Sequence, residues 1–539
     1  MLTCLRGGRV VDPLNGRDGI GDIWIRDTRI VAPPAAGGGA DETYDASGKI
    51  VMAGAIDIHS HIAGANVNAA RLLRPEQRDE KAHASGPTFS TFETGRRYAI
   101  MGFTTVIEPA ISPEQAIQAQ LELADVPIID KGILAILGND DFLLDLIHGK
   151  QGSDAVGDYV AWTIETTRAL GIKVINAGGA AAFKANARAF AFDDVVPVYG
   201  VSSREIVKAL QRGVHQAGVP HPLHVHCNNL GLPGNVDTAL ATIAAAEDLP
   251  LHLAHLQFYG YGAAGPRGFS SEAARLAAAV NSAKQVTIDV GQVLFGQTVT
   301  VSSDVLRQFN ARNAAHPRKW LIVDGDANGG GIVPYRYRPT NFFNVVQWAA
   351  GLELFLLIED PNKVLFTTDH PNGAPFTAYP DLFALLMDRE HRAAMIAQLP
   401  ADAIAMSTLS AIRREYSLAE IATMTRSAPA RLLGLADRGH LGVGALADVA
   451  VYADGRDRAA MFRAAALVFK DGELVVRDGE VTRYRWGRAL HVRAPRPAAI
   501  ERRMRSYYAE RYGLAPEAVR VHAGLIDRPE PFEDVPCRT

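Results

Sequence analysis

Cysteine is scarce in this chain of 539 residues: only Cys4, Cys227 and Cys537 occur, and they stand far apart. Three separated cysteines exclude a disulfide framework, an iron–sulfur run and a cysteine zinc knuckle. Any redox step would therefore need a separate protein partner. The N-terminus carries no positively charged segment followed by an apolar one, so we expect no secretory signal and a reduced, cytoplasmic protein.

Excess charge and long apolar runs are also missing. Lys and Arg total 55 against 59 Asp and Glu, which gives a formal net charge of −4. That balance excludes a dedicated nucleic-acid-binding protein. No run approaches the roughly 20 apolar residues that a membrane helix needs, so no membrane partner is expected. Lysine is rare, with 11 lysines against 44 arginines, so a lysine inside an apolar strand is unusual here.

The middle of the chain alternates apolar runs with helical stretches. This alternation repeats about eight times, and the helical stretches include residues 113–125, 203–218, 271–283 and 383–399. The repeat favours an α/β fold, a (β/α)₈ barrel with insertions over residues 51–429. A doubly wound sheet is the alternative, but no glycine-rich phosphate turn follows an early strand.

Both ends of the chain are different in character from the middle. Residues 1–50 and 430–485 contain short alternating strands, with hairpin signals at Asp471-Gly472 and Asp478-Gly479. Because domain termini often lie close together, we expect the two parts to form one small β-sandwich. The Arg-rich extension 486–539 is either a docking arm that contacts another subunit or a tail folded back on its own chain.

Two histidine pairs follow apolar runs in the predicted barrel. His59 and His61 come after residues 53–58, and positions i and i+2 of a strand share a face, so both imidazoles can bind one metal. His224 and His226 repeat this spacing, and His226 is the preferred ligand because it lies nearer the strand end.

A third histidine, His255, follows the run at 251–254, and His252, three residues earlier, is expected to point to the opposite side. The carboxylate of Asp369 ends the run at 363–368 and completes this series of strand ends. Taken singly, each of these residues is more often a capped or hydrogen-bonded strand end. The ordered set on successive strands is much more specific for a metal site at the carboxyl end of a barrel.

Lys173 lies inside the apolar run 171–175. It can be a lysine whose amine reaches out from a strand end. Alternatively, burial lowers its pKa, and the neutral amine reacts with carbon dioxide to form N6-carboxylysine, whose two oxygens suit two divalent cations. Lys184 is the rival position, but the sequence around it is typical of a loop or helix start.

The sequence resembles the amidohydrolase superfamily, because GAIDIHSH and APARLLGLADRGHLGVGALADVAVY are similar to its opening and closing segments. It resembles more closely the A-subunit family of formylmethanofuran dehydrogenase, which includes the A-subunits of bacterial formyltransferase/hydrolase complexes. GIKVINAGG, HVHCNNLGLPGN, HLAHLQFYGYG and TTDHPNGAPF carry that likeness, which covers nearly the whole chain.

The resemblance implies a metal-dependent barrel, and it implies ligands for one or two metal ions, with zinc expected from His and carboxylate donors. The implied ligands are His59 and His61 for one metal, His226 and His255 for the other, carboxylated Lys173 as the bridge, and Asp369 on the first metal. It further implies hydrolysis of an N-formyl group on a methanofuran-type C1 carrier, with release of formate. The implied partners are a formyltransferase-type subunit plus other subunits of a hetero-oligomeric complex.

Formamide hydrolysis needs an activated water and a group that moves protons. Metal ions lower the pKa of water, and Asp369 is the expected general base and acid. Asn229 is a candidate donor to the formyl group or formate, or alternatively an asparagine that holds a tight turn. Three other functions remain open: an archaeal-type subunit working in the formylating direction, a cyclic-amide hydrolase of the dihydropyrimidinase or hydantoinase kind, and a scaffold subunit without catalysis.

Overall fold

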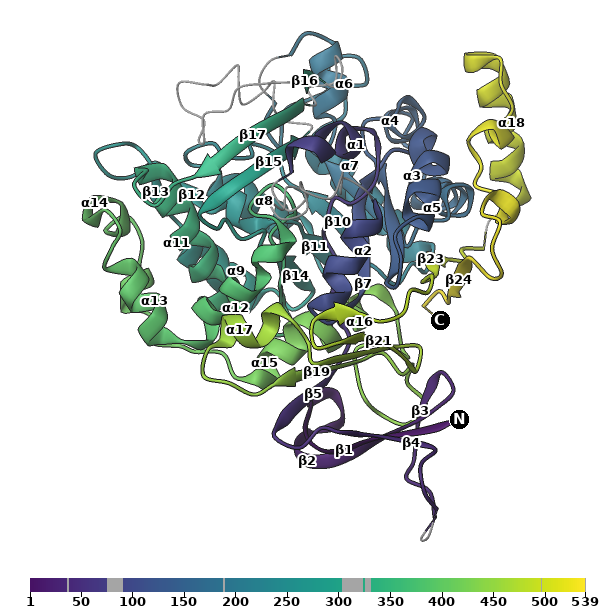
Figure 1. The fold of residues 1–539 in the computed structure, drawn as a ribbon. Helices are drawn as coiled ribbons and strands as arrows, with labels where there is room; N and C mark the ends of the chain where they lie inside the picture. Colours follow the sequence, from purple (N-terminus) through teal and green to yellow (C-terminus); the bar gives the residue numbers. More distant parts are fainter. Residues whose placement is uncertain are drawn as a thin grey trace.

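The computed structural model describes residues 1–35, 38–74, 91–187, 190–302, 323–324, 331–495 and 497–538. Its centre is a series of eight parallel strands (Figure 1). They are β6 (Ala55–Asp57), β7 (Phe103–Ile111), β8 (Asp130–Leu137), β9 (Gly171–Ile175), β10 (Leu223–His226), β11 (Leu251–Leu253), β14 (Val286–Asp289) and β18 (Val364–Leu365). A parallel bridge between Ser60 and His370 joins the two ends of the series. The predicted barrel is confirmed.

Helices on the outside connect these strands. They are α2 (Thr91–Ile100), α3 (Ala116–Ala124), α5 (Ser153–Thr167), α7 (Ser203–Gln216), α8 (Val236–Ala245), α9 (Ala273–Ser282) and α11 (Phe342–Leu357). The sequence of helix α7 determines both its start and its orientation. Ser202 and Glu205 form a capping box at the start, and Ile206 and Leu210 lie on the apolar face that is buried.

The helix expected over 383–399 is two helices, α12 (Tyr379–Met387) and α13 (Arg389–Ile396). Asp388 separates them because its backbone is extended and its carboxylate accepts a hydrogen bond from the His391 amide. An aspartate in this role is an N-cap, which starts a new helix and cannot continue the previous one.

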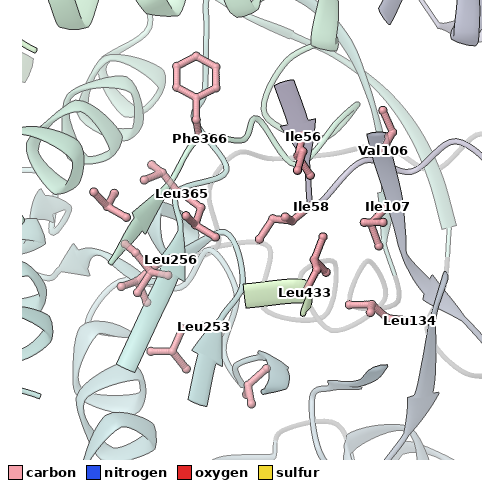
Figure 2. Packing of buried hydrophobic residues seen from close by; sticks show 14 of the residues in the cluster. Ile56, Ile58, Val106, Ile107, Leu134, Leu253, Leu256, Leu365, Phe366 and Leu433 are labelled. Carbon is pink, nitrogen blue, oxygen red and sulfur yellow. The ribbon is translucent and has the colours of Figure 1, made fainter. Parts of the chain in front are cut away.

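The main apolar core fills the space between the strands and the helices. Ile56, Val106, Leu134, Leu253 and Leu365 come from five barrel strands and are almost fully buried. Figure 2 shows these side chains together with Leu433 of α16 (Ala428–Leu433). Close packing of this kind holds the strand ends above it in place.

The two ends of the chain form one mixed sheet, which confirms that they fold together. Its strands are β1 (Leu2–Asp12), β2 (Arg17–Arg26), β3 (Arg29–Val31), β4 (Glu42–Asp45), β5 (Lys49–Ala53), β19 (Val449–Ala453), β20 (Leu467–Lys470), β21 (Glu473–Arg477) and β22 (Glu480–Val481). Antiparallel pairing of β5 with β19 joins the N-terminal and C-terminal parts. Asp471 and Gly472 turn between β20 and β21 with φ of 47° and 78°, the left-handed geometry that an Asp-Gly hairpin supplies.

An insertion covers the carboxyl ends of the barrel strands. It contains β15 (Gly296–Ser302), β16 (Val323–Asp324) and β17 (Gly331–Tyr337), beside the short helix α1 (Ala65–Ala70) (Figure 1). Ala70, Val299 and Ile332 form a small apolar cluster between them. Among the described residues, no helix is both long and apolar enough to cross a membrane.

The extension 486–539 folds back on its own chain, which is one of the two arrangements left open by the sequence. Strand β23 (Ala489–Val492) pairs in parallel with the start of β8, and β24 (Phe532–Val535) pairs with β23. Between them, α18 (Ala498–Tyr512) lies on the outside of the barrel (Figure 1).

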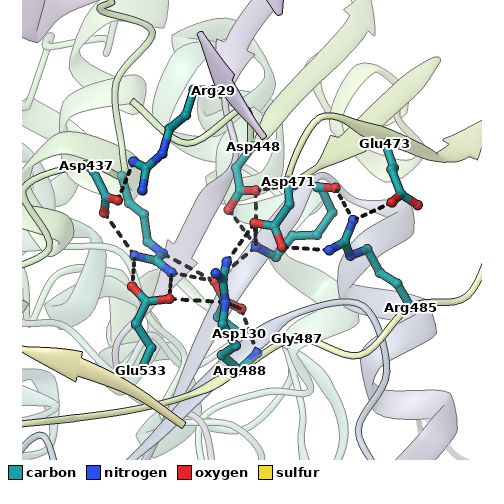
Figure 3. A network of polar contacts seen from close by, with 12 residues as sticks. Arg29, Asp130, Asp437, Asp448, Asp471, Glu473, Arg485, Gly487, Arg488 and Glu533 are labelled. Carbon is teal, nitrogen blue, oxygen red and sulfur yellow. Dashed lines mark hydrogen bonds and ion pairs between the residues drawn. The ribbon is translucent and has the colours of Figure 1, made fainter. Parts of the chain in front are cut away.

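A buried ionic network ties the barrel, the mixed sheet and the extension together (Figure 3). The amine of Lys470 lies 3.0 Å from Asp130, 3.0 Å from Asp448 and 2.9 Å from Asp471. Arg438 bridges Asp130 at 3.0 Å and Glu533 at 2.8 Å. The three aspartates stand close enough to hold a cation, and Lys470 supplies that charge.

Candidate metal centre

The predicted metal ligands come together at the carboxyl ends of the barrel strands. His59 and His61 follow β6, Lys173 lies in β9, His226 ends β10, His255 follows β11 and Asp369 follows β18. All six residues are buried. This end of the barrel is where catalytic groups gather in folds of this kind.

His59, His61, Lys173 and Asp369 form a first group, and their donor atoms stand at distances suited to one ion. Asp369 Oδ1 lies 3.1 Å from His59 Nε2 and 3.3 Å from His61 Nε2. Lys173 Nζ lies 3.1 Å from His59 Nε2. Ligand atoms around a tetrahedral zinc ion stand about 3.3 Å apart, so this spacing fits a metal.

His226 and His255 form the second group, beside the first. Their ring centroids are 4.6 Å apart, and the His255 ring lies 5.2 Å from that of His59. His255 Nδ1 is buried and has no hydrogen-bond partner in the described part of the chain. Buried polar atoms of this kind indicate an ion-binding site, and the His and carboxylate donors suit a divalent metal.

A cavity of about 240 Å³ opens onto the cluster. His61, Lys173, His226, His255 and Asp369 form its polar wall. Ile136, Leu230 and Phe258 are among the apolar residues on its lining. A small substrate group can therefore reach the metal ligands, with apolar side chains limiting the water around it.

Asn229 occupies a turn rather than the cavity wall. Its φ of 68° is left-handed, its side-chain nitrogen donates to Thr238 Oγ1 at 3.0 Å, and its carbonyl accepts from Asn235 at 3.0 Å. Among the described residues that line the cavity, Asn229 does not occur. Its role in substrate binding stays a prediction, and these contacts favour the turn.

The two remaining histidines of the predicted pairs lie one layer deeper in the barrel. His224 Nε2 stands 3.1 Å from His59 Nδ1, which supports the preference for His226 as the ligand. The expectation for His252 is wrong, because its ring lies inside the barrel, 4.6 Å from that of His224. Strand β11 ends at Leu253 and His255 is left-handed with φ of 34°, so strand alternation does not extend from His252 to His255.

Sequence reasoning missed two carboxylates that hold the ligands. Glu108 accepts from His61 Nδ1 at 3.0 Å and from the amides of Ile62 and Ala63 at 2.6 and 3.0 Å. Asp289 accepts from His59 Nδ1 at 3.0 Å and from the His255 amide at 2.9 Å. Each is a single carboxylate at the end of an apolar run, which is the signal that identified Asp369.

Burial and neighbouring groups shift the pKa values of two side chains in the cluster, Lys173 and Asp369. Burial lowers the pKa of Lys173 to about 8, although Asp369, Asp289 and Glu108 oppose this shift. Burial would raise the pKa of Asp369, but the imidazoles of His255 and His59 hold that pKa well below its usual range. Asp369 is therefore ionised at neutral pH, and Lys173 has a larger neutral fraction than a free lysine.

A parallel barrel with imidazoles, a lysine and a carboxylate at its strand ends defines a hydrolase site of the metal-dependent type. The family model described as "Amidohydrolase family" matches residues 42–483. The chain belongs to the amidohydrolase family.

Particular relatives resemble the chain over its whole length. It is 51% identical to the A-subunit of the formyltransferase/hydrolase complex Fhc of Methylorubrum extorquens, covering 100% of both chains. It is 38% identical to the protein FwdA of Methanocaldococcus jannaschii, covering 91% of each. The crystal structure of the complex FhcABCD from M. extorquens with methylofuran contains a chain that matches with a TM-score of 0.94 over 100% of both chains.

Proposed function

We propose that this chain hydrolyses the N-formyl group of a methanofuran-type C1 carrier, releasing formate and the free carrier amine. It does so as the metal-dependent amidohydrolase subunit of a cytoplasmic formyltransferase/hydrolase complex. The full-length match to the M. extorquens protein, whose complex was crystallised with methylofuran, carries the choice of substrate. The six clustered residues at the cavity support the reaction type.

The metal is held by the residues that the sequence predicted: His59, His61, His226, His255 and Asp369, with Lys173 between the two groups. Zinc suits this donor set, which contains no cysteine. When bound, a divalent metal activates water and polarises the formyl oxygen. The spacing of the donor atoms and the unpartnered Nδ1 of His255, among the described residues, support this assignment.

Lys173 is proposed to be carboxylated. Its lowered pKa, about 8, raises the fraction of neutral amine that can attack carbon dioxide. In that reaction the amine nitrogen bonds to the carbon of carbon dioxide and loses one proton, which leaves a carbamate. The change replaces a cation with an anion next to Asp369, Asp289 and Glu108, so the divalent cations held by the neighbouring residues would supply the compensating positive charge.

Asp369 is proposed to move the proton of the reaction. Because its pKa is held low, the carboxylate is ionised and can accept a proton from the attacking water. It then donates this proton to the carrier nitrogen as the C–N bond breaks. Hydrogen bonds hold the backbone of Asp369 in place. The Asn372 amide donates to the Asp369 carbonyl at 2.6 Å, and Asn372 Oδ1 in turn accepts from the Val301 amide of β15 at 2.8 Å.

The test is purification of the tagged chain with its associated subunits, followed by two assays. We expect a formyltransferase-type subunit in the complex and release of formate from the N-formyl carrier. Ring opening of hydantoin is the comparison reaction, and we expect none. Turnover of hydantoin without release of formate would contradict the proposal and favour a cyclic-amide hydrolase. A complex without bound metal or either activity would favour a scaffold.

A further inference from the structure

Exposed aromatic side chains gather at one place on the surface. The described part of the chain has four strongly exposed aromatic residues, and three of them, Phe92, Tyr484 and Trp486, lie together. The Phe92 ring centroid is 4.7 Å from Tyr484 and 6.4 Å from Trp486. The guanidinium of Arg528 lies over the Trp486 ring at 3.7 Å. We refer to these four residues as the aromatic patch.

A second cavity of about 350 Å³ adjoins the patch, on a different set of residues from the metal centre. Trp486 and Arg528 belong to both the patch and the cavity lining. Ile526, Pro529 and Pro531 add apolar surface, and the buried Lys131 adds an amine. The volume is ample for one large apolar side chain and a neighbouring polar group.

The backbone beneath the patch is held firmly. Ile128 and Lys131 donate their amides to the carbonyls of Arg485 and Arg488 at 2.8 and 2.9 Å. Gly487 lies so close to the barrel that a Cβ added there would collide with the carbonyl oxygen of Ile129. Trp486 is therefore displayed on a pinned segment, and little conformational entropy is lost when it is covered.

We propose that the aromatic patch and its cavity form the docking site for a segment of a partner subunit that carries an apolar side chain next to a carboxylate. This proposal rests on the proposed function, since it needs the subunits of a formyltransferase/hydrolase complex. Tryptophan, tyrosine and arginine are the residues that dominate binding energy at protein interfaces. Exposed aromatic clusters of this kind mark interaction sites on soluble proteins.

The charges in the cavity select the carboxylate. Lys131 lines the cavity, and its donations to the carbonyls of Val126 and Gly487 at 3.1 and 2.9 Å hold its amine there. Burial lowers the pKa of Lys131 to about 7, and an adjacent carboxylate would raise that pKa and restore the full charge. Arg485 already pairs with Asp471 at 3.0 Å and with Glu473 at 3.1 Å. Arg528 lies 3.8 Å from Asp125, so the buried Lys131 and the weakly paired Arg528 stand against Glu530, the remaining acidic residue of the lining.

The test compares complexes assembled from the tagged chain and the co-expressed subunits of the complex. We expect the double variant Phe92→Ser, Trp486→Ser to lower the affinity for the partner subunits by at least tenfold. The matched control is Tyr512→Ser with Leu514→Ser, which removes exposed apolar side chains elsewhere on the extension and should leave affinity unchanged. A second variant, Lys131→Met, should weaken binding and reduce its dependence on salt.

Bound metal and the melting temperature serve as folding readouts, and both should match the wild type in the surface variants. In Lys131→Met, which leaves the carbonyls of Val126 and Gly487 without their donor, bound metal alone is the folding readout. Equal affinity of wild type and Phe92→Ser, Trp486→Ser would overturn the docking proposal and leave the proposed function intact. Loss of a homodimer with all partner subunits retained would also overturn it, because the surface would then bind a second copy. If the wild-type chain binds no partner subunit, the proposed complex fails first, and the docking proposal fails with it.

Discussion

In the proposed metal site, Lys173 is the residue that would bridge the two ligand groups. It is buried in β9, its amine lies 3.1 Å from His59 Nε2, and its pKa is lowered to about 8. We predict that Lys173→Ala loses metal and activity together, and that a short-chain carboxylate added at millimolar concentration restores part of both. Metal content measured by elemental analysis is the test, and a full complement of metal in the variant would contradict the bridge.

Asp289 contacts two of the proposed metal ligands, His59 and His255. A histidine that binds metal through Nε2 must carry its proton on Nδ1, and Asp289 accepts that proton's hydrogen bond from His59. Asp289→Asn presents an amide in place of a carboxylate, so we predict metal affinity lowered by about 10- to 100-fold. Competition with a chelator measures this affinity.

Asp140→Asn is the matched control for that experiment. Asp140 is also held by hydrogen bonds at a strand-to-helix connection, where it caps α4 (Asp141–His148), but its contacts are the Leu143 amide and the Tyr159 hydroxyl. We expect its metal affinity to equal that of the wild type. Unchanged affinity in Asp289→Asn would show that His224, 3.1 Å from His59 Nδ1, accepts the proton instead.

At the scale of elements, Lys470 joins β20 to β8 through the buried network. Removing its charge leaves Asp130, Asp448 and Asp471 in contact without their central cation. We predict that Lys470→Met lowers the free energy of unfolding by about 3–5 kcal/mol. Chemical denaturation measures the change, while the exposed Lys284→Met serves as control and should change stability by less than about 0.5 kcal/mol.

That network also predicts how stability depends on pH. Burial would raise the pKa of Asp130, but Lys470, Arg438 and Arg488 hold it well below its usual range. A lowered pKa contributes stability at pH values above the unfolded pKa, and this stability is lost as the pH falls toward the folded pKa. The junction between the barrel and the mixed sheet should therefore weaken in acid.

The elements show which parts of the molecule follow from local sequence. Alternation and helix period predict the barrel strands and α7, because burial repeats along each element. The break at Asp388 and the inward position of His252 depend on single capping and left-handed residues, which periodicity does not capture. The pairing of β23 with β8 involves residues more than 350 positions apart, so no local pattern indicates it.

For the candidate site, the order of His, Lys and Asp along the chain, together with the family resemblance, predicts six residues that the structure brings together. Glu108 and Asp289 were missed because a carboxylate at a strand end has many ordinary roles. Only their distances of 3.0 Å from His61 and His59 identify what they hold. Asn229 shows the reverse case, because an asparagine near the ligands is held in a turn by Thr238.

At the scale of the whole molecule, one chain supplies a barrel, a mixed sheet from its two ends and an extension that returns to the barrel. Its metal centre and the aromatic patch occupy different cavities, which share no lining residue in the described part of the chain. Hydrolysis and assembly can therefore be separated by mutation. A variant of the patch should keep its metal, and a variant of the metal centre should keep its partners.

In the proposed reaction, Asp369 moves the proton in formamide hydrolysis at a metal held by its neighbours. The most direct measurement is formate release from the N-formyl carrier by complexes that carry wild type or Asp369→Asn, each normalised to bound metal. We predict that the variant assembles and retains metal but releases formate about 10²- to 10⁴-fold more slowly. Release at the wild-type rate, with metal retained, would show that Asp369 does not move the proton.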